Sequence, residues 1–129
     1  GSPVALAAAS AVLDVIEEEG LLARAVEIGA RIRTRIAACT KRNDLVPISG
    51  LRGPGAMIAF DIVRADGTPD GVEAKRVCSR ALSEGLILLT CGHQGQAIRI
   101  LVPLTASDAL IDEGLDALER ALVPEDTAV

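Results

Sequence analysis

Arg99 is the residue whose type and setting most clearly indicate chemistry. It is the only charged residue in the apolar run from Ala97 to Leu104. A buried charge without a partner is prohibitively costly, so this guanidinium must either face solvent or meet an anion. Its planar fork of N–H donors matches a carboxylate in a bidentate pair. The sequence therefore predicts a carboxylate-binding arginine on a strand. A strand arginine that faces solvent or pairs with a structural Asp or Glu is the alternative.

The other reactive side chains lack the neighbours that catalysis or metal binding requires. The single histidine, His93, lies in a glycine-containing loop, and Asp61 and Asp66 have no support as an acid–base pair. Residues 52–55 contain two glycines but not the following lysine and helix of a phosphate-binding loop. The acidic run 17–19 has no metal-binding histidine beside it. We therefore expect no catalytic residue and no metal site in this chain.

Two lysines, Lys41 and Lys75, are the only side-chain amines. A lysine that forms a Schiff base needs a desolvated pocket that lowers its pKa. Each of these lysines is followed by an arginine on a polar stretch, so we expect both to be exposed. Neither is expected to form a Schiff base.

Composition excludes several classes of protein. The 129 residues carry a net charge of −5 and include one aromatic residue, Phe60. Nucleic-acid binding needs a basic face or stacking aromatics, and anionic membranes repel an acidic chain, so we expect neither partner. The longest apolar stretch, residues 4–13, is too short to span a bilayer. Three widely separated cysteines (Cys39, Cys78 and Cys91) are typical of reduced thiols in a cytoplasmic protein.

The elements that must position Arg99 follow from hydrophobic periodicity. Pro3 and Gly20 bound a first predicted helix, and a second runs over residues 21–40. Residues 46–51 and 56–63 predict two strands, with a bulge or tight bend at the glycines flanking Pro54. A third helix is expected to be capped at Thr68–Pro69 and to end at Gly85. Strands are expected next over residues 86–89 and 97–102. A last helix follows, capped by Thr105 together with Asp108 and stopped by Pro124, and residues 125–129 form a tail.

The charged residues of the first two predicted helices indicate which side of each helix is turned to solvent. The basic residues of the second helix (Arg24, Arg31, Arg33 and Arg35) fall mainly outside its apolar stripe. We expect them to form a solvent face, with the acidic first helix as a partner for some of them.

The order of elements predicts the fold class. Two hairpin-like strand pairs, each followed by a helix, favour an α+β domain with a small, mainly antiparallel sheet and helices on one face. The length fits a single domain over residues 1–129, because domains are commonly about 100–150 residues long.

Four segments closely resemble class III pyridoxal-phosphate aminotransferases, and above all their 4-aminobutyrate subgroup. Residues 1–5 resemble the Gly-Asn-Pro-x-Ala opening of the family's C-terminal domain, with Ser2 in place of Asn; Gly1-Ser2 is otherwise typical of a cloning remnant. Residues 50–58 resemble the V-R-G-x-G-A-M strand, and 85–89 match G-L-I-L-L. Residues 98–105 resemble L-R-I-L-V-P-L-T, with Ile98 in the Leu position.

This resemblance implies a role for Arg99 and a context for the chain. In the family, the arginine of the last segment holds the substrate carboxylate, notably that of glutamate or 2-oxoglutarate. The chain would be the C-terminal small domain of a fold-type I enzyme, without the large domain that binds pyridoxal phosphate. It would be inactive alone and bind no cofactor. The complete enzyme would be a homodimer that uses pyridoxal 5′-phosphate and acts on small amino acids and 2-oxo acids.

Two other hypotheses remain open. The chain could belong to another class III aminotransferase, of the ornithine or acetylornithine type. It could also be a free-standing regulatory α+β module that uses Arg99 to recognise a small carboxylate.

Overall fold

Four helices and four strands follow one another in the predicted order. The computed structural model describes residues 1–124, so the tail expected over 125–129 lies outside the described residues. The elements are α1 (Pro3–Glu18), α2 (Leu21–Cys39), β1 (Ile48–Arg52), β2 (Met57–Ile62), α3 (Gly71–Ser83), β3 (Leu89–Cys91), β4 (Ala97–Leu101) and α4 (Asp108–Ala121). None of the helices in this range is long and apolar enough to cross a membrane.

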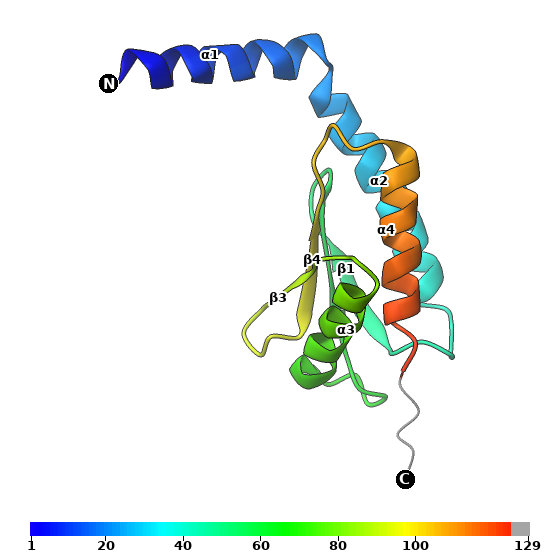
Figure 1. Cartoon of the computed structure of the whole chain (residues 1–129). Coiled ribbons are helices and arrows are strands. Elements are labelled where there is room, and N and C mark those ends of the chain that lie inside the picture. The colour runs from blue at the N-terminus through cyan, green and yellow to red at the C-terminus, as the bar shows by residue number, and fades with distance from the viewer. Residues whose placement is uncertain (125–129) are drawn as a thin grey trace.

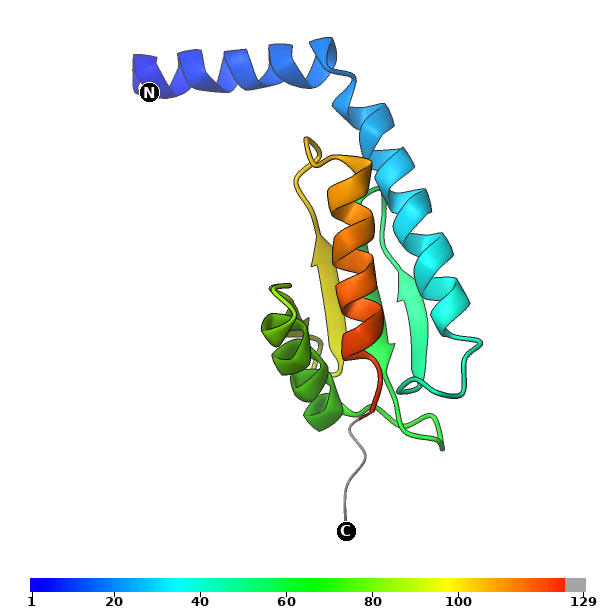
Figure 2. The same cartoon turned by 45° about the vertical axis from the view of Figure 1, so that its right-hand side comes forward.

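The strands form one antiparallel sheet in the order β1-β2-β4-β3. Helices α2, α3 and α4 lie on one side of it, and α4 lies between α3 and α2 (Figures 1 and 2). This arrangement confirms the predicted α+β class, with an antiparallel sheet and helices on one face.

Alternation along the two central strands places the core between sheet and helices. Ile58, Phe60 and Ile62 of β2 are buried, as are Ile98 and Ile100 of β4. Successive side chains of a strand point to opposite faces, so the intervening residues, such as Ala59 and Arg99, must point away from the helices. The helices contribute a matching apolar layer that includes Ile28, Ile32, Ile36, Leu115 and Leu118.

Helix α1 stands apart from this core. The predicted helix is confirmed, with Pro3 in its first turn and Gly20 in the left-handed region (φ +61°) just beyond it. However, none of its residues is buried, and α2 is the only described element against which it packs. It projects from the top of the body (Figure 1), so that Val4 and Leu13 are exposed.

Both predicted helix caps are wrong by two residues. Asp70, not Thr68–Pro69, caps α3 and accepts a hydrogen bond from the Glu73 amide at 3.0 Å. Pro69 instead forms an isolated β-bridge with Val63, which holds it outside the helix. Ser107, not Thr105, caps α4 and accepts from the Leu110 amide at 3.2 Å. In each case a stronger capping residue stands closer to the helix.

The third strand begins later than predicted. The apolar run 86–89 was expected to pair, but β3 spans Leu89–Cys91. The Leu86 amide donates to the Ala81 carbonyl at 2.8 Å, so residue 86 still belongs to the end of α3. The predicted bend at Pro54 is confirmed, because the Met57 amide donates to the Pro54 carbonyl at 3.0 Å. The bulge lies elsewhere, between Ser49 and Arg52.

Three of the four basic residues of α2 pair with α4, which corrects the expectation of a solvent face with α1 as the partner of some of them. Arg24 contacts Asp108 at 2.7 Å, and Arg31 contacts Asp112 at 2.9 Å. Two more arginines, Arg35 towards the C-terminal end of α2 and Arg42 just beyond it, both form ion pairs with Glu119 of α4. None of the described ion pairs involves an acidic residue of α1. Arg24, Arg31 and Arg35 of α2 therefore join two helices of the same layer.

A glycine lets α2 approach the turn before β2. A Cβ atom added to Gly29 would lie 2.0 Å from the carbonyl oxygen of Gly55, a contact that the backbone could not accommodate without moving. The close approach places the 53–56 turn against the helix and fixes where β2 begins. Gly114 in α4 differs, since its added Cβ would meet only a side-chain carbon of Leu86 at 3.7 Å.

These two helical glycines should respond oppositely to alanine. Gly29→Ala should lower the free energy of unfolding by about 1–3 kcal/mol, because the turn must move away from the helix. Gly114→Ala should raise it by up to about 1 kcal/mol, because alanine favours the helix and no clash opposes it. Urea denaturation of both variants measures this difference, and equal effects would contradict the close approach at Gly29.

Acid should weaken the contact between α2 and α4. The hydrogen bond from Arg24 to Asp108 lowers the pKa of that carboxyl in the folded chain. The resulting stabilisation is complete above the ordinary aspartate pKa of about 3.9 and is lost as the pH falls through the lower folded-state value. The thermal midpoint of Asp108→Asn should lie below that of the parent at about pH 6. The two midpoints should converge as the pH falls through the lowered folded-state pKa of Asp108.

Asp14→Asn is the control for this experiment, because Asp14 has no ion pair with another described residue. A constant difference between Asp108→Asn and the parent across the whole pH range would contradict the proposed ionic contribution.

Candidate functional site

The uncovered side of the sheet carries the residues that could bind a ligand. We call it the open face. It comprises Arg52 of β1, Met57, Ala59 and Asp61 of β2, Leu89 and Cys91 of β3, and Arg99 and Leu101 of β4. None of the helices described packs on it, since α2, α3 and α4 occupy the other side (Figure 2).

Arg99 lies at the centre of the open face. Its strand neighbours in register are Ala59 of β2 and Leu89 of β3. The side chain is exposed, and two exposed leucines, Leu89 and Leu101, lie beside it, each 65% accessible. A cation surrounded by apolar side chains would attract an anion strongly if another surface covered the face and excluded water.

Arg99 differs from every other arginine of the chain in its lack of a partner. Of the eleven arginines, ten contact a carboxylate or a backbone carbonyl: Arg24, Arg31, Arg33, Arg35, Arg42, Arg52, Arg64, Arg76, Arg80 and Arg120. Arg99 alone has no hydrogen-bond or ion-pair partner within residues 1–124. Pairing with a structural Asp or Glu, one of the two predicted alternatives, is therefore not seen in that range. The other alternative, an arginine that faces solvent, agrees with the exposed side chain and stays open. Its role as a substrate-binding residue stays a prediction.

The open face holds a second arginine, which is fully engaged. Arg52 binds Asp61 through two parallel bonds, Nη2 to Oδ1 at 2.8 Å and Nη1 to Oδ2 at 2.9 Å. The hydrogen bond to Asp61 raises the pKa of Arg52, so this guanidinium stays charged. This pair was not predicted from the sequence. The alternation of side chains along β2 predicts that Asp61 and Ala59 share a face. Arg52 reaches that face only because of a β-bulge, which the sequence does not reveal.

The remaining candidate residues lie elsewhere and stay apart. His93 is exposed in the β3–β4 loop, and Lys41 and Lys75 are exposed at the end of α2 and on α3. Asp66 accepts hydrogen bonds from the amide and hydroxyl of Thr68, which lower the pKa of its carboxyl. It therefore does not lie with Asp61 as an acid–base pair.

Metal chemistry has no visible support in the described part of the chain. Residues 1–124 contain no group of three or more His, Cys, Asp or Glu side chains placed to hold a metal ion. The three cysteines are unpaired, and burial raises the pKa of the Cys39 and Cys78 thiols, which disfavours the reactive thiolate.

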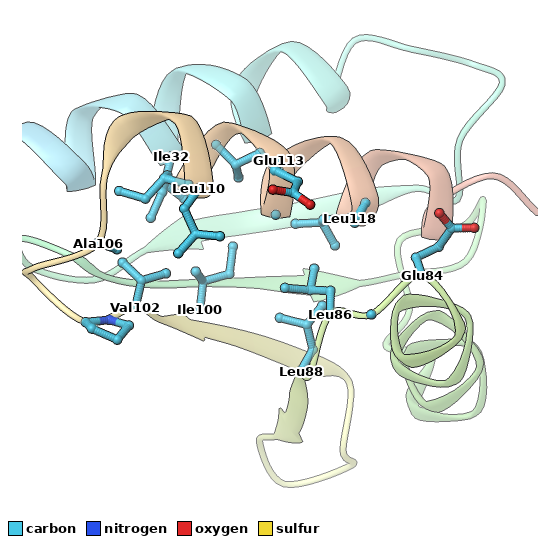
Figure 3. Close-up of a pocket in the computed structure, with 16 residues that line it drawn as sticks. Ile32, Glu84, Leu86, Leu88, Ile100, Val102, Ala106, Leu110, Glu113 and Leu118 are labelled. Carbon is cyan, nitrogen blue, oxygen red and sulfur yellow. The ribbon is translucent and has the colours of Figure 1, made fainter.

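A hollow of about 270 Å³ lies on the opposite side of the sheet, between α4 and the segment leading into β3 (Figure 3). Its lining is mostly aliphatic and includes Leu86, Ile100 and Leu110. The charged side chains around it, Glu84 and Glu113, are both acidic. A carboxylate would meet no cation among the residues that line the hollow. The hollow therefore favours an apolar group, whereas the open face favours an anion, and the two are separate features.

The open face can bind an anion but offers no group for proton transfer or nucleophilic attack. Its one carboxylate is occupied by Arg52. Cys91 is only partly exposed, and no hydrogen bond joins it to a histidine or lysine in the described residues. Chemistry on a ligand held by Arg99 would therefore need groups from outside the described open face.

Comparison with known proteins shows where such a domain occurs. A family model for class-III aminotransferases matches residues 1–122. A 5-aminovalerate aminotransferase from Pseudomonas putida is 44% identical over 121 residues, covering 93% of this chain and 28% of the relative. A 4-aminobutyrate aminotransferase from Mycobacterium leprae is 45% identical over 124 residues, with 95% and 27% covered. The chain thus spans just over a quarter of the length of these relatives.

Solved structures give the same fold. A phospholyase from Arthrobacter in complex with phosphoethanolamine superposes with a TM-score of 0.87 at 26% sequence identity. The match covers 95% of this chain and 29% of the phospholyase.

Proposed function

This chain belongs to the class-III aminotransferases, and from that membership we propose that it is the C-terminal domain of a 4-aminobutyrate–2-oxoglutarate aminotransferase. Arg99 would hold the carboxylate of the substrate. The observation that carries this proposal is the position of Arg99, central on the open face and without a partner in residues 1–124 while ten other arginines have one. Arg52, the other arginine of the open face, is already paired with Asp61 and is not offered as a carboxylate ligand.

The chemistry of the ligand follows from the guanidinium. A carboxylate accepts two N–H bonds from one arginine, which fixes both the position and the rotation of the bound group. The named activities of the two relatives concern ω-amino acids, which carry a carboxylate at one end and an amine at the other. We propose that Arg99 binds the α-carboxylate of glutamate or 2-oxoglutarate, so that the reacting carbon is held at a fixed distance from the open face.

The residues of this chain do not fit pyridoxal phosphate. A cofactor lysine would have to lie near Arg99 in a protected pocket, yet both lysines are exposed: Lys41 lies in the turn after α2, and Lys75 lies on α3. We propose that the rest of a longer protein holds the cofactor, which supplies the electron sink for amino transfer when bound. This domain supplies substrate binding and orientation.

We also propose that the whole of residues 1–129 is one domain and that further parts of the protein cover its open face. The coverage of just over a quarter of the relatives supports this, as do the exposed leucines beside Arg99. A covered face would exclude water from the Arg99 pair and strengthen it. The complete enzyme is proposed to be a cytoplasmic homodimer, in keeping with its unpaired cysteines and the apolar surface of α1.

Replacing Arg99 in the complete enzyme tests the proposal. Arg99→Gln should lower kcat/KM for 2-oxoglutarate about 100-fold, because a charged bidentate pair is lost. Arg99→Lys should retain the charge but not the fork, and should lose about tenfold. Arg120→Gln, which breaks an exposed ion pair with Glu84 on the helical side, is the matched control and should stay near the parent value. Unchanged kinetics of Arg99→Gln would contradict the assignment.

A donor panel identifies the substrate. With the complete enzyme, 4-aminobutyrate should give a higher kcat/KM than 5-aminovalerate, ornithine or acetylornithine. Preference for ornithine or acetylornithine would instead support the alternative subgroup within class III.

Measurements on residues 1–129 alone separate an enzyme domain from a free-standing binding module. Calorimetry with glutamate should show no submillimolar binding, since Arg99 alone forms only half of a site. Pyridoxal phosphate should likewise give no stable stoichiometric chromophore, because both lysines are exposed. Submillimolar glutamate binding by the isolated chain would favour the regulatory module.

A further inference from the structure

The Arg52–Asp61 pair lies close to Arg99 on the same face of the sheet. In the register of β2 and β4, Ala59 is opposite Arg99 and Asp61 is opposite Ala97. Asp61 and Arg99 are therefore diagonal neighbours on adjacent strands. Such neighbours lie roughly 7–8 Å apart, a separation that a long arginine side chain can cross. Asp61 is the only carboxylate on the open face, so it is the internal anion best placed to reach Arg99.

A β-bulge brings Arg52 to this face. Ser49 is opposite Asp61, and regular pairing from there would place Arg52 opposite Ile58, on the buried side. The register shifts between Ser49 and Arg52, so Arg52 lies opposite Ala59 instead. The extra residue thereby turns the arginine from the core side to the open face.

Gly50 makes this bulge and the ion pair possible. It has φ +62°, a conformation that residues with side chains rarely adopt. A Cβ at this position would also lie 2.9 Å from Oδ2 of Asp61 and 3.0 Å from Nη1 of Arg52. In addition, Nη1 donates to the Gly50 carbonyl at 2.7 Å, which holds the guanidinium against the bulge. Backbone geometry thus directs Arg52 at Asp61.

Occupation of Asp61 has a consequence for Arg99. Both carboxylate oxygens accept from Arg52, and the Asp61 side chain is only 22% accessible. A carboxylate with its charge balanced in this way has little remaining attraction for a second cation. Without Arg52, the same carboxylate would be an uncompensated anion within reach of Arg99. It would then compete with a ligand carboxylate for the same guanidinium.

We propose that Arg52 is a positioning residue that keeps Asp61 away from Arg99, so that Arg99 remains available to the substrate carboxylate. This inference rests on the proposed function of Arg99. It adds that the second arginine of the open face acts through Asp61 and does not contact the substrate.

The central variant is Arg52→Met, which retains the length of the side chain without its charge or donors. In the complete enzyme, KM for 2-oxoglutarate should rise about three- to tenfold, because Asp61 now competes for Arg99. The kcat at saturating substrate should stay within about twofold, since the substrate displaces Asp61 when bound. Arg52→Lys retains a charge beside Asp61 and should give a smaller rise in KM.

Removing the competitor should rescue the variant. Asp61→Asn alone should leave KM close to the parent value, and Arg52→Met/Asp61→Asn should return KM to within about twofold of it. A double variant that stays as impaired as Arg52→Met would overturn the inference, because the pair would then serve only to hold β1 and β2 together. An unchanged KM in Arg52→Met would overturn it equally. Should Arg52→Met fail to fold, Arg52→Gln with the same double variant provides the test.

Arg99→Gln in parallel separates the two proposals. If Arg99→Gln raises KM for 2-oxoglutarate and Arg52→Met does not, only the positioning role is wrong. If Arg99→Gln leaves KM unchanged, Arg99 is not the carboxylate ligand, and the positioning role fails with it.

Discussion

The burial of one face of the sheet against three helices is the constraint from which the geometry of Arg99 follows. Phe60 of β2 and Ile98 and Ile100 of β4 are buried beneath the helices. Because side chains alternate along a strand, Arg99 between two buried isoleucines must point to the other face. A slip of one residue in register would move Arg99 into the core and its apolar neighbours to solvent. The packing energy of the core therefore specifies the direction of the only arginine without a partner in residues 1–124.

The ion pairs that hold α2 against α4 lie within the helical layer and do not involve the open face. Four arginines of α2 and its C-terminal extension contact acidic residues of α4, and Arg24 also donates to the Ala106 carbonyl at 2.8 Å. These ion pairs are partly exposed, so each contributes modestly to stability. Their greater effect is on placement, since they satisfy the basic side chains of α2 within the helical layer. Arg52 plays the corresponding part on the open face by satisfying Asp61.

The sequence predicted the elements that depend on local periodicity and failed where a tertiary contact decides. Helix order, the strand that carries Arg99 and the one-sided sheet all follow from apolar spacing. The caps at Asp70 and Ser107 were missed because several capping residues stand within a few positions of each other. Choosing among them requires knowledge of the β-bridge at Pro69 and of the chain's path into α4.

In the candidate site too, one part could be predicted from local sequence and the other depends on a tertiary contact. Arg99 could be recognised as an isolated charge in an apolar strand. The Arg52–Asp61 pair could not, because Gly50, which shifts the register, looks like any turn glycine in the sequence.

The fold alone does not determine which substrate such a domain serves. The phospholyase that shares this architecture was solved with phosphoethanolamine, a molecule that has a phosphate and an amine but no carboxylate. The same sheet and helices thus occur in a protein that was solved with a ligand lacking a carboxylate. Under the function proposed here, the selective element in this chain is a side chain that distinguishes a planar carboxylate, and the open face offers one unpaired guanidinium for that purpose within the described residues. Selectivity would then depend on two features that the fold does not require: an arginine at position 99 and a neighbouring carboxylate prevented from binding it.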